Sequence, residues 1–180
     1  MNPPLDPPQR PAGESVFQTP WFEIVATPVP GSAAPFYVIH CTNFVALAAL
    51  NEQGELLLVR QYRPGAGAVT LEVPGGHVEA GETPEQAARK ELLEETGHEA
   101  GPLELLAVIS PSNARFTNRM WCYFAPDSRP AAHAAAQREA GVELVRYRGG
   151  VRALTADPEF SSAGSWALLL AALRAGKVAW

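Results

Sequence analysis

The chain of 180 residues is long enough for one domain with a substantial hydrophobic core, and 47% hydrophobic with 18% charged residues is an ordinary globular composition. The net charge of −5 and the pI near 5.4 argue against a general binding surface for nucleic acid or anionic membranes. We therefore expect neither nucleic acid nor a membrane as a partner.

The cysteine content and the N-terminus bear on the compartment. Cys41 and Cys122 are the only cysteines, and they lack the paired spacing of a zinc site or a disulfide framework. We interpret both as buried thiols in a reducing compartment. The chain shows no charged start followed by an apolar run, and no run of about 18 apolar residues that would span a bilayer. These features predict a cytoplasmic protein.

The pattern along the chain predicts a mixed fold. Residues 1–15 are rich in proline and poor in large apolar side chains, which predicts a disordered arm. One helix is predicted after residue 83, and a second covers about residues 165–175. Short β-type runs lie at 21–29, 36–41, 44–50, 55–60, 69–73, 104–109, 120–124 and 142–147. This order predicts an α/β (α+β) sandwich in which helices cover the faces of a mixed sheet.

The ends of the first helix are marked by capping signals. Thr83 and Gln86 have the spacing of a capping box, in which each side chain binds the backbone N–H of the other residue. Pro84 fits the first helical position. Gly97 supplies a left-handed stop. The helix is therefore predicted between Thr83 and Gly97.

Three glutamates share one side of this helix. Glu91, Glu94 and Glu95 are spaced i, i+3 and i+4, so their carboxylates project together. Such like charges repel by a few tenths of a kcal/mol per pair, roughly, unless a cation lies among the oxygens. Mg²⁺ binds in this way, through one or two carboxylates plus water and substrate phosphates. The alternative interpretation of these residues alone is a solvated acidic face.

The residues before the helix favour the metal site. From Gly76 the segment reads GHVEAGETPEQAARKELLEETGH, with acidic residues and glycines at fixed spacings. It closely resembles the Nudix box, a signature of loop, helix and loop. Two positions depart from that signature, because Lys90 replaces the usual arginine and His98 the usual final aliphatic residue. Lysine keeps the charge of arginine but lacks its forked guanidinium.

The resemblance implies roles for the acidic residues. Glu91 and Glu95 match the principal metal ligands of the family, and the carbonyl of Gly75 matches a further ligand. Glu94 matches the third acidic position, which binds metal or aids the attacking water, and Glu82 matches the acid that braces the box. The implied cofactor is Mg²⁺, for which Mn²⁺ can substitute.

The flanking segments LLLVRQYRPGAGAVTLEVPGG and SPSNARFTNRMWCYFA resemble the ADP-ribose pyrophosphatase branch of that family. This resemblance implies that Arg63 and Arg119 bind substrate, with a surface role as the alternative for each. It also implies that Trp21 stacks on a nucleobase across a dimer, with a core or interface tryptophan as the alternative. The assisting base of this branch is assigned to Glu139, because the following Ala140 and Gly141 suggest a loop, whereas Glu143 lies in a predicted strand.

The resemblance thus implies a Nudix-type α/β/α sandwich over residues 44–180. The β segments at 16–43 precede this sandwich and would leave an exposed edge with apolar side chains, so we expect them to lie at a homodimer interface. The implied reaction is Mg²⁺-dependent hydrolysis of a pyrophosphate bond, with ADP-ribose split into AMP and ribose 5-phosphate. A GDP-mannose-type nucleotide-sugar pyrophosphatase and a non-catalytic nucleotide sensor on the same fold are the alternatives. A sensor would normally have an eroded box, whereas all the acidic positions are retained here.

Overall fold

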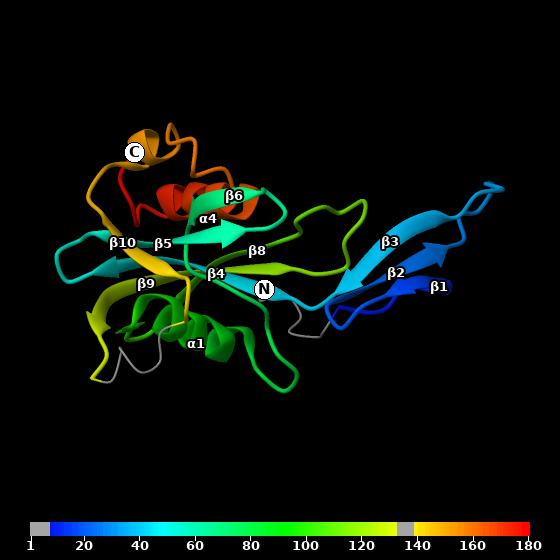
Figure 1. Cartoon of the computed structure of the whole chain (residues 1–180), viewed down its shortest axis with the longest axis horizontal. Coiled ribbons are helices and arrows are strands. Elements are labelled where there is room, and N and C mark those ends of the chain that lie inside the picture. Colours follow the sequence, from blue (N-terminus) through cyan, green and yellow to red (C-terminus); the bar gives the residue numbers. More distant parts are fainter. Residues whose placement is uncertain (1–7, 133–138) are drawn as a thin grey trace.

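The computed structural model describes residues 8–132 and 139–180, and in it helices cover both faces of a mixed sheet (Figure 1). Helix α1 (Pro84–Thr96) lies against one face, and α4 (Ala163–Arg174) lies against the other with the short α3 (Val151–Leu154) beside it. The strands of this sheet are β4 (Phe44–Asn51), β5 (Leu56–Arg63), β6 (Ala68–Glu72), β7 (His98–Glu99), β8 (Glu104–Ile109), β9 (Met120–Pro130) and β10 (Glu143–Tyr147).

The sheet is mixed, as predicted. Its main path runs β10-β5-β4-β9-β7, while β6 pairs with β5 and β8 pairs with β9. Strands β4 and β9 are parallel, and the other pairs are antiparallel, including β4 with β5. The α/β/α sandwich predicted from the sequence is therefore confirmed.

The strands divide the core into two layers because successive side chains point to opposite faces. On β5, Leu57 contacts the cluster that contains α1, and Leu58 contacts the cluster that contains α4; both side chains are fully buried. Helix α1 contributes Ala87, Ala88 and Leu92 to its layer, and α4 contributes Leu168, Leu169 and Ala172. The two layers fix the height of α1 above the sheet.

The predicted caps of α1 are confirmed. The Thr83 hydroxyl accepts from the Gln86 amide at 3.2 Å, and the Gln86 side chain accepts from the Thr83 amide at 2.8 Å. Gly97 ends the helix with φ of 71°, a left-handed conformation that side chains with a Cβ rarely adopt. With both ends fixed, the rotation of α1 is set, and with it the direction of the glutamates on its final turns.

A separate three-stranded sheet precedes the sandwich and projects to one side of it (Figure 1). It consists of β1 (Glu14–Gln18), β2 (Phe22–Thr27) and β3 (Phe36–Cys41), in antiparallel order. Strand β1 was not predicted, and it begins inside the segment 1–15 that was expected to be a disordered arm. Residues 1–7 of that arm lie outside the described residues. The N-terminal sheet is attached to the sandwich where Ile39 bridges to Phe116.

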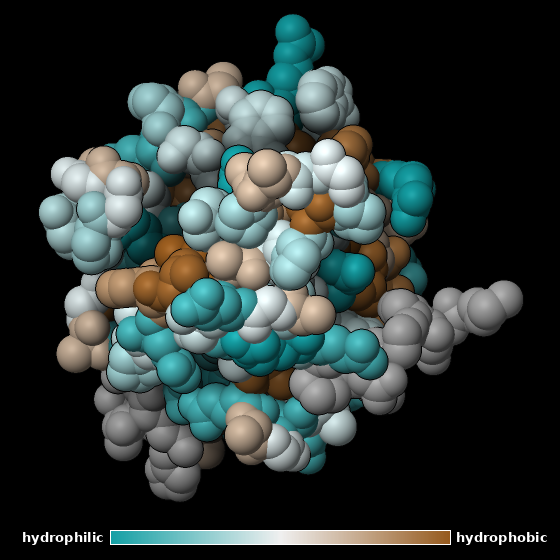
Figure 2. Space-filling view, turned by 90° about the vertical axis from the view of Figure 1, so that its right-hand side faces the viewer, coloured by the Kyte–Doolittle hydropathy of each residue, from teal (hydrophilic) through white to brown (hydrophobic). Residues whose placement is uncertain are grey.

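Apolar side chains are exposed on the N-terminal sheet. Seen from its side of the molecule, brown apolar surface is broken up by polar residues (Figure 2). The large exposed side chains of this sheet and the turn after β1 are Val16, Phe17, Trp21, Phe22, Phe36 and Tyr37. In the part of the chain that is described, no helix combines the length and apolar character needed to cross a membrane.

Candidate active site

The carboxylate of Glu95 lies at the centre of the site. The residue is 3% exposed, and its Oε2 accepts a hydrogen bond of 2.8 Å from the backbone N–H of Gly75. Its Oε1 lies 3.4 Å from Nε2 of Gln61 on β5. Burial raises the pKa of Glu95 to about 8, although the Gly75 N–H acts in the opposite direction. Burial in the folded chain therefore destabilises the charged form of the Glu95 carboxylate.

Glu91 lies one turn earlier, against the same loop. Burial raises its pKa to about 7, and the negative charge of Glu94 adds to the shift. A Cβ on Gly76 would overlap the carboxylate of Glu91, so a larger residue there would displace this carboxylate from its position. The helix and the loop therefore bring Glu91 and Glu95 together beside Gly75 and Gly76.

The backbone of the Gly75–Gly76 loop makes specific contacts with β4 and with Glu95. The carbonyls of Pro74 and Gly76 accept from Leu47 and Val45 of β4, whereas the N–H of Gly75 points to Glu95. No hydrogen bond to the Gly75 carbonyl occurs within residues 8–132 and 139–180. The Gly75 carbonyl therefore has no hydrogen-bond partner in that part of the chain, and its role as a metal ligand stays a prediction.

The donor set fits a hard divalent cation. Two partly buried carboxylates and a carbonyl oxygen are ligands that Mg²⁺ prefers, and a cation would relieve the charge penalty on Glu91 and Glu95. As they stand, no three His, Cys, Asp or Glu side chains of the described ranges are grouped closely enough to hold a metal ion. Mg²⁺ does not require such a group, because it takes one or two carboxylates and completes its shell with water and phosphate.

A cavity of about 620 Å³ opens beside the cluster. It lies between the N-terminal sheet, the Gly75–Gly76 loop and the start of α4. Arg63 and Trp21, both predicted to bind substrate, line it, and Trp21 is 74% exposed. A drug-sized organic ligand fits a cavity of this size.

Arg119 does not line this cavity. Its neighbours Asn118 and Met120 do, because alternate residues entering β9 face opposite ways. The guanidinium of Arg119 is exposed, and Nη1 lies 3.3 Å from the carbonyl of Asn118. The position of Arg119 therefore does not support the prediction that it binds substrate, whereas Asn118, which was not predicted, lines the cavity.

Glu139 is near the acidic cluster, whereas Glu143 is not. The N–H of Glu139 donates to the carbonyl of Glu94 at 2.7 Å. Burial is the main cause of the raised pKa of Glu91 and Glu95, and the charge of Glu139 contributes to both shifts. Glu143 instead lies 3.6 Å from the guanidinium of Arg60. The structure therefore places Glu139, and not Glu143, beside the acidic cluster, and the role of Glu139 as the assisting base stays a prediction.

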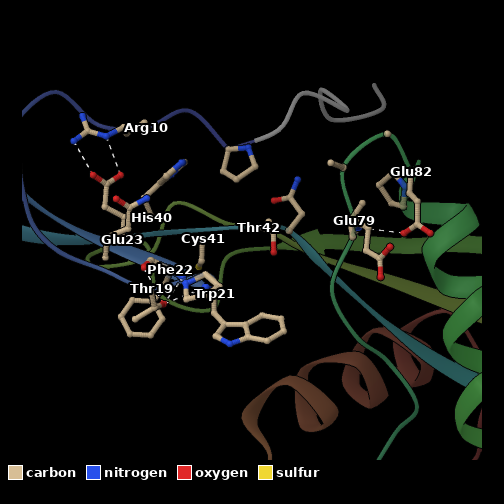
Figure 3. Close-up of a pocket in the computed structure, with 18 residues that line it drawn as sticks. Arg10, Thr19, Trp21, Phe22, Glu23, His40, Cys41, Thr42, Glu79 and Glu82 are labelled. Carbon is tan, nitrogen blue, oxygen red and sulfur yellow. Dashed lines mark hydrogen bonds and ion pairs between the residues drawn. The ribbon is translucent and has the colours of Figure 1, made fainter. Parts of the chain in front are cut away.

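A second cavity, of about 690 Å³, separates the N-terminal sheet from the loop before α1 (Figure 3). Trp21 and Phe22 lie on one side, and Glu79 and Glu82 lie on the loop opposite them. Trp21 and Phe22 also line the first cavity. The N-terminal sheet thus forms a wall of both spaces.

Residues 40–166 match the NUDIX domain family, which covers most of the chain and includes the whole acidic cluster. The chain belongs to the Nudix family. The resemblance of its loop and first helix to the Nudix box is thereby confirmed.

Individual relatives cover shorter stretches. An ADP-ribose pyrophosphatase of Bacillus subtilis is 36% identical over 82 residues, which are 46% of this chain and 44% of that protein. An ADP-sugar pyrophosphatase of Mus musculus is 54% identical over 43 residues, 24% of this chain and 20% of that protein. The chain thus matches less than half the length of each. A crystal structure of an ADP compounds hydrolase shares the fold, with a TM-score of 0.72 and 21% identity, over 98% of this chain and all of that one.

Lys90 occupies the position of the usual arginine of the Nudix box, and it contacts two glutamates. Its Nζ lies 2.6 Å from Glu79 and 3.8 Å from Glu82, both on the loop before α1. Glu82 in turn accepts from the N–H of Glu79 at 3.1 Å. Lys90 therefore ties the loop to the helix through point contacts, where arginine would offer a fork of donors.

We expect Lys90→Arg to preserve or raise kcat/KM, since a guanidinium can contact Glu79 and Glu82 at once. Steady-state kinetics of the two proteins measure the effect, with Arg89→Lys as the control on the neighbouring position. A folded Lys90→Arg protein without activity would show that Lys90 has a role other than bracing the loop.

Proposed function

We propose that this chain is a Mg²⁺-dependent Nudix hydrolase that splits ADP-ribose into AMP and ribose 5-phosphate. The observation that carries the proposal is that Glu95 and Glu91 lie against Gly75 and Gly76, two residues that line a cavity together with Arg63. The names of the matched Bacillus subtilis and mouse proteins support an ADP-linked substrate.

The proposed mechanism assigns one task to each residue. Glu91, Glu95 and the Gly75 carbonyl would hold Mg²⁺, and Mn²⁺ would fit the same oxygen donors. When bound, the cation supplies neutralisation of phosphate charge and activation of water. Glu94 and Glu139 would orient the attacking water and accept its proton. The bond between one phosphorus and the bridging oxygen then breaks, and the two products leave as phosphate monoesters.

Arg63 and Trp21 would bind the substrate. Arg63 lines the same cavity as Gly75, which supports a contact between its guanidinium and phosphate oxygens. Trp21 offers an exposed ring for stacking on the base, from the same chain or across a dimer. Arg119 is left out of this assignment because it does not line the cavity.

The substrate is tested by comparing kcat/KM for ADP-ribose, ADP-glucose and GDP-mannose under the same Mg²⁺ concentration. We expect ADP-ribose to give the highest value. A far higher value for GDP-mannose would reject the proposed substrate and favour a nucleotide-sugar pyrophosphatase, and the reaction class would stand. Binding of all three without turnover would favour the sensor.

We also expect a homodimer formed through the N-terminal sheet, because β1 is an edge strand and large apolar side chains are exposed beside it. Sedimentation at micromolar concentration should show a dimer. Phe17, 54% exposed, is the position for a disrupting change, and Phe17→Asp should give a monomer. The control is Leu170→Asp on α4, a residue 68% exposed and away from that sheet, which should remain dimeric. A monomeric native chain would contradict this prediction.

A further inference from the structure

The guanidinium of Arg63 is hydrogen-bonded to the carboxylate of Glu72. Its Nε donates to Oε1 of Glu72 at 3.2 Å and its Nη2 to Oε2 at 2.9 Å, a bidentate contact. The hydroxyl of Thr70 donates to Oε1 of Glu72 at 2.6 Å. We call Arg63, Glu72 and Thr70 the Arg63 clamp.

The strand register puts the Arg63 clamp on the side of the sheet that carries the acidic cluster. Strands β5 and β6 are antiparallel, with Gln61 opposite Thr70, so the side chains at 61 and 63 share a face with those at 70 and 72. Gln61 approaches Glu95 from this face. Arg63 and Glu72 both line the 620 Å³ cavity.

The contacts leave one end of the guanidinium for a ligand. Nε and Nη2 face Glu72, and Nη1 makes no hydrogen bond to any residue in the described ranges. Because the guanidinium is planar and rigid, fixing one edge also fixes the direction of Nη1. Burial acts to raise the pKa of Glu72, but the hydrogen bonds from Arg63 and Thr70 outweigh it and hold that pKa below its usual value. Glu72 therefore remains charged beside the arginine.

We propose that Glu72, supported by Thr70, is a positioning residue that holds Arg63 with Nη1 toward the phosphates of a nucleoside diphosphate. This inference rests on the proposed function, because it needs such a ligand in the cavity. A preorganised arginine loses less side-chain entropy on binding than a free one, so the clamp increases affinity without touching the ligand.

The alternative is that Glu72 has a purely structural role. The chain contains another arginine–glutamate pair that serves as a comparison. Arg60 lies on the other face of β5, where its Nε donates to Glu159 at 2.9 Å. Neither residue lines the 620 Å³ cavity. The Arg60–Glu159 contact is a single hydrogen bond, with Glu143 also near Arg60, and it lies away from the cavity. Glu159→Gln is therefore the control for losing an arginine–glutamate pair that does not face the ligand.

The first test is kinetic. Glu72→Gln should raise KM for ADP-ribose by roughly 10-fold with kcat changed far less, because it removes a charged partner of Arg63 and leaves the metal-binding oxygens in place. Thr70→Val should raise KM in the same direction by a smaller factor. Glu159→Gln should leave both constants unchanged. A fall in kcat with KM unchanged, or an equal rise in KM for Glu159→Gln, would overturn the proposal.

The second test asks whether Glu72 acts through Arg63. Arg63→Ala should raise KM by itself, and adding Glu72→Gln to it should cause no further rise, since the group that Glu72 positions is then absent. If the KM increases of the two single variants multiply in the double variant, Glu72 contributes to binding without acting through Arg63, and the proposal is overturned. If Glu72→Gln fails to fold, Thr70→Val is carried through the same cycle.

Calorimetric titration with ADP-ribose in a Glu95→Gln background separates this inference from the proposed function. If the Glu72→Gln change weakens ADP-ribose binding in this background, and the native chain does not turn ADP-ribose over, the proposed hydrolase is rejected and the positioning role of Glu72 is kept. Turnover by the native chain with unchanged affinity in the Glu72→Gln protein would reject the clamp and keep the hydrolase. Absence of ADP-ribose binding by the native chain would reject both.

Discussion

Glu95→Gln is expected to lower kcat by on the order of 10³-fold, because a metal-binding carboxylate contributes several kcal/mol of charge stabilisation in the transition state. Glutamine has nearly the same shape, and its carbonyl oxygen can still accept from the Gly75 N–H that now binds Oε2. The change also removes a charge that burial disfavours. The thermal unfolding midpoint of the metal-free protein should therefore be maintained or raised while activity is lost.

The control for this change is Glu85→Gln on the first turn of the same helix. Glu85 is exposed, pairs with Arg89 at 2.8 Å and lies away from the Gly75–Gly76 loop. Its replacement should leave kcat within about 2-fold, since exposed i, i+4 pairs contribute only a few tenths of a kcal/mol. An equal loss of kcat in Glu85→Gln and Glu95→Gln would show that the loss comes from the change in helix charge and not from the loss of a metal-binding carboxylate.

Removal of divalent cations is the second change with a large expected effect. EDTA in excess should reduce ADP-ribose hydrolysis to background, because it removes the cation that would neutralise phosphate charge and activate the attacking water. Adding Mg²⁺ or Mn²⁺ beyond the chelator should restore the rate. Measured rates across a Mg²⁺ titration give the apparent affinity of the site, and full activity in EDTA would contradict the assignment of these carboxylates.

The parts of the site that lie close together in the sequence were predictable. The helix between Thr83 and Gly97 follows from local capping chemistry, and the spacing of Glu91 and Glu95 places both carboxylates on one side of it. Gly75 and Gly76 follow directly after a predicted strand. The match of residues 40–166 to the NUDIX domain family then confirmed the family that this segment resembles.

The parts that depend on strand register were not predictable in the same way. The contact between Arg63 and Glu72 requires the register of β5 with β6, which no single segment specifies. The choice between Asn118 and Arg119 depends on where the chain turns into β9, and a shift of one residue exchanges the faces. An alternation count from Met120 backwards would have favoured Asn118.

The elements that were missed have weak local signals. The strand β1 is exposed along its whole length, so its sequence shows no alternation of apolar and polar residues. The helix α3 has only four residues and lacks a side-chain cap. Strand β9 continues to Pro130, well past the predicted end at residue 124, because its later residues pair with β7 and β4. Tertiary pairing determines these boundaries.

The proposed hydrolase activity is tested most directly by identifying the products of ADP-ribose after incubation with the purified chain and Mg²⁺. Hydrolysis at the pyrophosphate should release AMP and ribose 5-phosphate in equal amounts, at a rate that the Glu95→Gln protein does not reach. Recovery of intact ADP-ribose, and of every other nucleoside diphosphate derivative offered, from a folded and Mg²⁺-saturated chain would contradict the proposed hydrolase.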